Sequence, residues 1–158
     1  MDPALQALLD RQAIDDLVNA YCNASDRHDH EKMRALYHED AVDDHGGFYK
    51  GLAMEFIDKL PEIQAPMRIL HHNITTRNIK LDGNYAEGEL YVLAFHQVET
   101  EDGLLDLMIG GRYFDKYEKR GASGSSRSRC PSSTRRGSAC PRRANGSHRP
   151  GRARASAA

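Results

Sequence analysis

The sequence has no tryptophan, only three cysteines and no long apolar run. The cysteines, Cys22, Cys130 and Cys140, form no CxxC pair and are odd in number, which argues against a disulfide framework or a zinc ribbon. No stretch reaches the roughly 18 apolar residues of a membrane helix, and residues 1–3 lack the features of a secretory signal. We therefore expect a soluble, cytoplasmic protein that does not bind membranes.

Acidic residues are absent from the C-terminal part of the chain. Residues 1–120 hold all 23 Asp and Glu with 13 Lys and Arg, whereas residues 121–158 hold nine Arg and no acid. The second segment also lacks Leu, Ile, Val, Met, Phe and Tyr, so it cannot bury enough apolar surface to offset its chain entropy. The sequence predicts one domain over residues 1–120, followed by a disordered Arg/Ser/Pro-rich tail over residues 121–158.

In the N-terminal part of that domain, apolar residues recur with the period of a helix. Apolar residues recur at three-to-four spacing over Ala4–Ala24 and again over Glu31–Tyr37, as in amphipathic helices. Residues 41–51 indicate a short strand and a glycine turn. A third helix is predicted over Leu52–Leu60 and should end at Pro61, because proline disrupts a helix interior.

From Met67 onward the apolar period changes from about four residues to two. Strands are predicted over Met67–Leu81, Tyr85–Glu99 and Leu104–Glu118, separated by turns at residues 82–84 and 101–103. Helices followed by an antiparallel meander indicate an α+β fold.

A possible catalytic set begins where the first helix ends. Tyr21 lies on the apolar face of that helix and Asp26 just beyond it, while His71 and His72 are on the first long strand. A carboxylate that orients an imidazole makes a general base of near-neutral pKa. Neighbouring strand residues face opposite sides, so the pattern leaves His71 or His72 as the partner. Asp26 as a helix cap, Tyr21 as a core aromatic and His72 on a solvated face are the structural alternatives.

Other histidines and one arginine are candidates for ligand contacts. Residues 28–30 and 43–45 contain His and Asp, but adjacent strand residues diverge, so we expect no metal site. His45 is placed at the mouth of a pocket instead. His96 and Arg112 lie on successive strands and could face the cavity, where Arg112 would bind a carboxylate; a cross-strand ion pair is the alternative for Arg112.

The chain resembles the SnoaL-like family of the nuclear transport factor 2 superfamily, the cystatin-like α+β barrels. Five segments carry the resemblance, in the same order along the chain as in the family. They are residues 13–17 through to Asp26, residues 37–42, the strand with His71 and His72, residues 79–83 and residues 111–118. The resemblance implies a cone-like barrel in which a curved antiparallel sheet wraps around the N-terminal helices. It covers residues 5–120, in the element order derived above.

Within the superfamily, the chain is most similar to the branch containing bile acid 7α-dehydratase, hexachlorocyclohexane dehydrochlorinase and scytalone dehydratase. This implies cofactor-independent elimination from a small, largely apolar ring substrate, in a homodimer or homotrimer. The resemblance gives His72 as base with His71 as fallback, Asp26 as orienting carboxylate and Tyr21 as acid. A non-catalytic ligand-binding or assembly module and a polyketide-cyclase-like aldol catalyst are the alternatives.

The chain departs from the family pattern after residue 120, where a further strand with an aromatic and an aliphatic residue is expected. The tail begins there instead. We hypothesise that the tail is an out-of-frame translation of GC-rich DNA, which would replace the last strand and leave an open sheet edge. A nucleic-acid-binding arm is not expected, because the tail has no aromatic residue for stacking and the domain is acidic.

Overall fold

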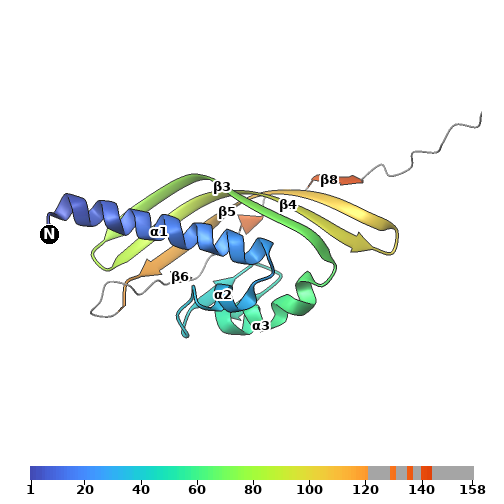
Figure 1. Cartoon of the computed structure of the whole chain (residues 1–158), viewed down its shortest axis with the longest axis horizontal. Helices are drawn as coiled ribbons and strands as arrows, with labels where there is room; N and C mark the ends of the chain where they lie inside the picture. The colour runs from blue at the N-terminus through green and yellow to red at the C-terminus, as the bar shows by residue number, and fades with distance from the viewer. Residues whose placement is uncertain (121–128, 131–134, 137–139, 144–158) are drawn as a thin grey trace, which may run out of the picture.

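The computed structural model describes residues 1–120, 129–130, 135–136 and 140–143, and places the helices along one side of a long sheet (Figure 1). The first helix, α1, spans Pro3–Asp26. Asp2 caps it by accepting hydrogen bonds from the backbone N–H groups of Ala4 and Leu5, and Pro3 occupies a first-turn position where its missing N–H costs nothing. Its buried face consists of Ile14, Leu17, Val18, Tyr21, Ala24 and Ser25.

The second helix, α2, spans His30–Arg34 and is shorter than the predicted 31–37. Asp29 caps it by accepting the N–H of Lys32. After Arg34 the backbone bonds to the carbonyl three residues back, so the helix gives way to a tight turn. Met33 is buried and anchors this short helix to the core.

The third helix, α3, spans Ala53–Gln64, so the prediction that it ends at Pro61 is wrong. Pro61 removes one backbone hydrogen bond and disfavours the helix by about 3 kcal/mol. Residues beyond it compensate: Gln64 is buried and Ile63 packs against the core. Tertiary burial on the far side of the proline therefore outweighs its local effect.

Two short strands, β1 (Val42–Asp44) and β2 (Lys50–Leu52), form a small hairpin beneath the main sheet. The main sheet is an antiparallel meander of β3 (Met67–Asp82), β4 (Tyr85–Thr100) and β5 (Gly103–Glu118). The three predicted long strands are confirmed to within one residue at each end.

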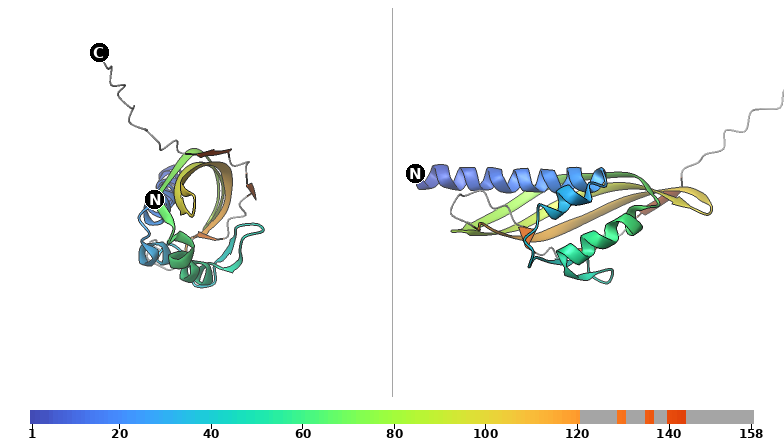
Figure 2. Two further views of the ribbon diagram at one scale, coloured as in Figure 1. Left: turned by 90° about the vertical axis from the view of Figure 1, so that its right-hand side faces the viewer. Right: turned by 60° about the horizontal axis from the view of Figure 1, so that its bottom comes forward.

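The sheet is strongly curved, and its concave face is turned toward the helices (Figure 2). Two register irregularities interrupt the pairing of β3 with β4, at Met67/Ile69 and Ile74/Arg77. Such bulges bend a strand and increase its twist. The predicted α+β fold, a curved antiparallel sheet around N-terminal helices, is confirmed. Its core joins residues of all three helices to Ala86, Leu90, Val92, Ala94, Tyr113 and Tyr117 of the sheet.

Three further strands pair antiparallel with β5: β6 (Arg129–Cys130), β7 (Arg135–Arg136) and β8 (Cys140–Arg143). The other residues of the predicted 121–158 tail lie outside the described residues, and its out-of-frame origin stays a hypothesis. In the part of the chain that the structure describes, no helix is both long and apolar enough to cross a membrane.

Candidate active site

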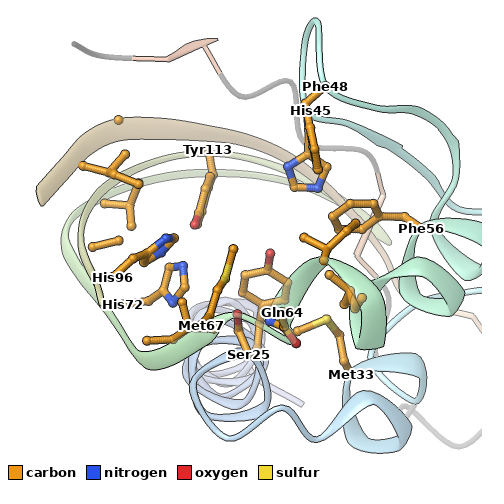
Figure 3. A pocket seen from close by; sticks show the side chains of 18 of the residues that line it. Ser25, Met33, His45, Phe48, Phe56, Gln64, Met67, His72, His96 and Tyr113 are labelled. Carbon is orange, nitrogen blue, oxygen red and sulfur yellow. The ribbon is translucent and has the colours of Figure 1, made fainter. Parts of the chain in front are cut away.

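A cavity of about 380 Å³ lies between the concave face of the sheet, the end of α1, α3 and the β1–β2 loop (Figure 3). Most of its lining is apolar or aromatic, and none of the described lining residues is Lys, Arg, Asp or Glu. The lining residues are Tyr21, Ser25, Met33, His45, Phe48, Phe56, Leu60, Ile63, Gln64, Met67, Leu70, His72, Val92, Ala94, His96, Ile109, Gly110, Gly111 and Tyr113.

Asp26 and His72 meet at one wall of this cavity. The Nδ1 atom of His72 lies 2.6 Å from Oδ1 of Asp26, and the His72 backbone N–H donates to both carboxylate oxygens at 3.1 Å. The two side chains are only 20% and 10% exposed for Asp26 and His72 respectively. Because Nδ1 faces the carboxylate, the second ring nitrogen, Nε2, is the one left for a ligand.

The fold explains why these two residues meet although 46 positions separate them. Asp26 is the last residue of α1, and α1 packs against β3. Along β3 the side chains alternate: Leu70 and His72 line the cavity, while His71 is exposed on the other face. The structure thus brings His72 to the site and leaves His71 outside it.

Tyr21 also lines the cavity, one helical turn and a residue before Asp26. Its side chain is buried, and its ring meets that of Tyr113 edge to face, with the centroids 6.1 Å apart and the planes at 85°. This arrangement is a favourable aromatic geometry and holds the Tyr21 ring at the cavity wall.

His96 lies beside His72, with the ring centroids 5.3 Å apart. Burial, aided by the nearby His72, lowers the pKa of His96 to about 4, although the Asp26 carboxylate acts in the opposite direction. The Nε2 atom of His96 is buried and has no hydrogen-bond partner among the described residues. His96 is therefore a neutral imidazole near pH 7.

His45 enters the cavity from the loop after β1, on the side opposite His72 and His96 (Figure 3). Its ring lies on that of Phe56, with a centroid separation of 4.2 Å. Nε2 of His45 is 3.2 Å from Oδ2 of the buried Asp43, at an angle that does not give a hydrogen bond. The structure thus places His45 in the lining of the cavity.

Arg112 is not among the residues that line the cavity, so the expectation that it reaches the pocket to bind a carboxylate is wrong. It is exposed, pairs with Glu89 at 2.8 Å and covers the rings of Tyr91 and Phe114. It lies one residue away from Tyr113 on β5, so strand alternation directs it to the outer face. The cross-strand ion pair, the alternative for this residue, is the arrangement found.

Asp43, Tyr113 and Gln64 were missed in the sequence. Asp43, on β1, comes two residues before His45, which directly follows the strand, and in extended backbone this spacing places both side chains on one face. Tyr113 follows the same alternation as the buried Tyr117. Gln64 gave no signal, because it lies beyond Pro61; its Oε1 atom is 2.8 Å from Nε2 of His30.

Metal ligation finds no support among the described residues, where no group of three or more His, Cys, Asp or Glu side chains is arranged to hold an ion. Residues 28–30 serve local structure instead: Asp29 caps α2 and His30 contacts Gln64.

A family model described as a SnoaL-like domain matches residues 6–124. No curated protein matches the chain.

Several solved structures have the same fold. A candidate scytalone dehydratase from Novosphingobium aromaticivorans is 21% identical with a TM-score of 0.75, covering 94% of this chain and 97% of its own. A type 3 hexachlorocyclohexane dehydrochlorinase from Novosphingobium barchaimii is 19% identical with a TM-score of 0.76, at 94% and 99% coverage. A candidate aromatic ring hydroxylase from N. aromaticivorans is 23% identical with a TM-score of 0.75, at 85% and 94%. At these identities the likeness establishes a shared fold, one that lyases of the dehydratase type also use.

Proposed function

Because the chain belongs to the SnoaL-like domain family, we propose that it is a cofactor-independent lyase that eliminates water or a similar leaving group from a small, largely apolar ring substrate. The observation that carries the proposal is the contact of 2.6 Å between Asp26 and His72 at the wall of an apolar cavity. A carboxylate-oriented imidazole beside a ligand-sized space is suited to removing a proton from carbon.

His72 is the base. Its Nε2 atom takes the proton from a carbon next to a carbonyl, and the electron pair of that C–H bond forms the new double bond as the bond to the leaving oxygen breaks. Asp26 fixes the tautomer with Nε2 unprotonated and stabilises the imidazolium that forms. Tyr21 supplies the proton that converts the leaving hydroxide to water, and the proton held by His72 later restores the phenol.

The neutral state of His96 favours this role of His72. With the two rings 5.3 Å apart, a charge on His96 would oppose the protonation of His72. The low pKa of His96, about 4, removes that repulsion over the neutral range of pH. The apolar lining of the cavity also strengthens the attraction between the imidazolium and Asp26, because little water screens it.

The proposal is tested with a panel of neutral cyclic β-hydroxy ketones, in which elimination yields a conjugated enone that absorbs in the ultraviolet. We expect His72→Ala and Asp26→Asn each to lower kcat/KM by about 10² to 10⁴-fold. His71→Ala makes the matched change on the exposed face of the same strand and should retain wild-type turnover. Unchanged turnover in both site variants would sink the proposal.

Ligand binding without catalysis is the second candidate, because an apolar cavity of about 380 Å³ is sufficient for that role by itself. It would be favoured if the wild-type protein binds cyclic ketones, turns none of them over, and keeps its affinity in His72→Ala. An aldol cyclisation would use the same base and is distinguished by the formation of a carbon–carbon bond in the product.

A further inference from the structure

We propose that Gln64 is a specificity-determining residue whose side-chain amide donates a hydrogen bond to an uncharged acceptor atom of the substrate, and that His30 is its positioning residue. The ligand class is then an uncharged compound that presents an acceptor oxygen, such as a carbonyl or an ether, to the end of α3. This inference rests on the proposed function in one respect, since it takes the cavity as the substrate site.

Gln64 interrupts an otherwise apolar face of α3. Phe56, Leu60 and Gln64 follow one another at intervals of four residues, so they share one face of the helix, and all three line the cavity. Gln64 is only 5% exposed, which makes it as buried as the two apolar residues of that face. A buried amide is unfavourable unless its polar atoms have partners. The contacts of each polar atom of Gln64 therefore decide what the residue can do.

The oxygen of the Gln64 side chain has a partner in His30. Oε1 of Gln64 lies 2.8 Å from Nε2 of His30, so the oxygen accepts the proton that this ring nitrogen carries. A glutamine amide also has two N–H donors on its nitrogen. With the oxygen directed at His30, these donors are turned away from His30, and among the described residues none accepts a hydrogen bond from them. The donors are therefore what Gln64 offers to a ligand in the cavity that it lines.

His30 holds the amide from outside the cavity. It is the first residue of α2, which packs against α3, and it is not among the described residues that line the cavity. Its half-buried ring stacks on that of His28, with the planes 13° apart and the centroids separated by 6.5 Å. Figure 3 shows Gln64 itself on the helical side of the cavity. An amide oriented before a ligand arrives loses little further freedom on binding, which favours selective recognition.

The absence of charge in the described lining decides which acceptor suits Gln64. The described lining residues include no Lys or Arg, so an anionic acceptor would lose its hydration without an opposite charge in contact. An uncharged oxygen avoids that loss and still accepts from the amide. A ligand with a hydrocarbon group at the same place would leave the buried donors unpaired, which is unfavourable. Sites built in this way discriminate strongly against an analogue that lacks the polar atom.

The experiment measures equilibrium binding by calorimetry at pH 8 with two probes of the same shape, 1-tetralone and 1-methylenetetralin, in which an exocyclic methylene group replaces the carbonyl oxygen. Both bicyclic compounds are small enough for a cavity of about 380 Å³. The quantity compared is the ratio of the Kd of the alkene to the Kd of the ketone, because changes that affect both probes equally cancel in it. We expect this ratio to fall about three- to tenfold in Gln64→Met, the value of one hydrogen bond.

Methionine matches glutamine in length and lacks the amide, and Gln12→Met makes the same change at an exposed position of α1, where the wild-type ratio should be kept. His30→Phe removes the nitrogen that holds the amide oxygen, so the amide is free to rotate and the ratio should fall about two- to threefold. His30→Gln supplies another N–H donor and should restore the wild-type ratio, a rescue that a general loss of packing would not produce.

The inference is overturned if Gln64→Met keeps the wild-type ratio, or if the wild-type protein binds neither probe. An unchanged ratio in His30→Phe, or a low ratio in His30→Gln, would overturn the positioning role of His30. The proposed function fails separately, because its test is the turnover of His72→Ala and Asp26→Asn. A lower ratio in Gln64→Met with no enzymatic turnover in any of the proteins would support recognition by Gln64 and reject the lyase.

Discussion

The carboxylate of Asp26 makes two kinds of contact with His72. It accepts the backbone N–H of His72 on both oxygens and meets the ring nitrogen of the same residue. The first contact ties the end of α1 to β3, and the second orients the imidazole. A substitution at Asp26 therefore alters the position of the strand as well as the chemistry, which makes Asp26→Asn, with its similar shape, the informative variant.

His96 should make the stability of the protein depend on pH. Its pKa is about 4 in the folded protein and 6.5 ordinarily, so the unfolded chain binds a proton first as the pH falls. The contribution is complete above pH 6.5 and is lost between pH 6.5 and about 4. We expect the wild type to lose about 2 kcal/mol more than His96→Phe across this range, after allowance for partial solvent exposure.

The measurement is urea unfolding of both proteins at pH 7.5 and pH 4. His71→Phe serves as the comparison, because it removes a histidine from the exposed face and should retain the wild-type difference. Equal loss of stability in the wild type and His96→Phe would show that burial of His96 does not disfavour its protonation.

Among the elements, α3 is the one whose local sequence and final structure disagree. It carries Phe56, Leu60 and Gln64 into the cavity wall, and Gln64 is reached only because the helix continues beyond Pro61. The helix thus lacks the backbone hydrogen bond that proline removes, and its last turn packs against the core nevertheless.

Pro61→Ala should stabilise the protein by about 1 to 2 kcal/mol, because alanine restores a helical N–H and is a better helix former. Part of this gain is offset because alanine gives the unfolded chain more conformational entropy than proline does. Thermal unfolding measures the effect as a rise in Tm. Pro3→Ala is the control, since Pro3 occupies the first turn of α1 where proline is favourable, and it should change Tm little. A lower Tm for Pro61→Ala would contradict this account of α3.

In the whole molecule, the inner face of the sheet and the helices share one core. Leu90, in the middle of β4, is fully buried, whereas Leu93 on the same strand is 44% exposed on the outer face. Side chains on the inner face of the long strands therefore contribute more to the free energy of folding than side chains on the outer face. The homodimer or homotrimer expected from the resemblance stays a prediction.

Leu90→Ala should lower the free energy of unfolding by about 2 to 5 kcal/mol, because it removes buried methyl groups and leaves a void that packed neighbours cannot fill. Leu93→Ala makes the same chemical change on the outer face and should cost less than about 1 kcal/mol. Denaturant unfolding compares the two variants. Similar losses for both would mean that the two faces of β4 are not distinguished as described.

The sequence by itself determined the α+β class and the three long strands, and it singled out Asp26 and the His71-His72 pair as candidates for the proposed dyad. Strand alternation and turn residues are local properties, so they predicted β3, β4 and β5 to within one residue. A carboxylate at a helix end and paired histidines on a strand also stand out locally, which is why Asp26 and the pair His71-His72 could be named as candidates.

The tertiary structure decided which face of each strand is covered and what lies across the cavity. Alternation defines two faces but does not say which one the helices bury, so His72 could not be separated from His71, nor Arg112 assigned to the outside. Burial against distant residues also carried α3 past Pro61 and paired Asp43 with His45 beside Phe56. These outcomes depend on contacts between segments far apart in the chain, which no local pattern contains.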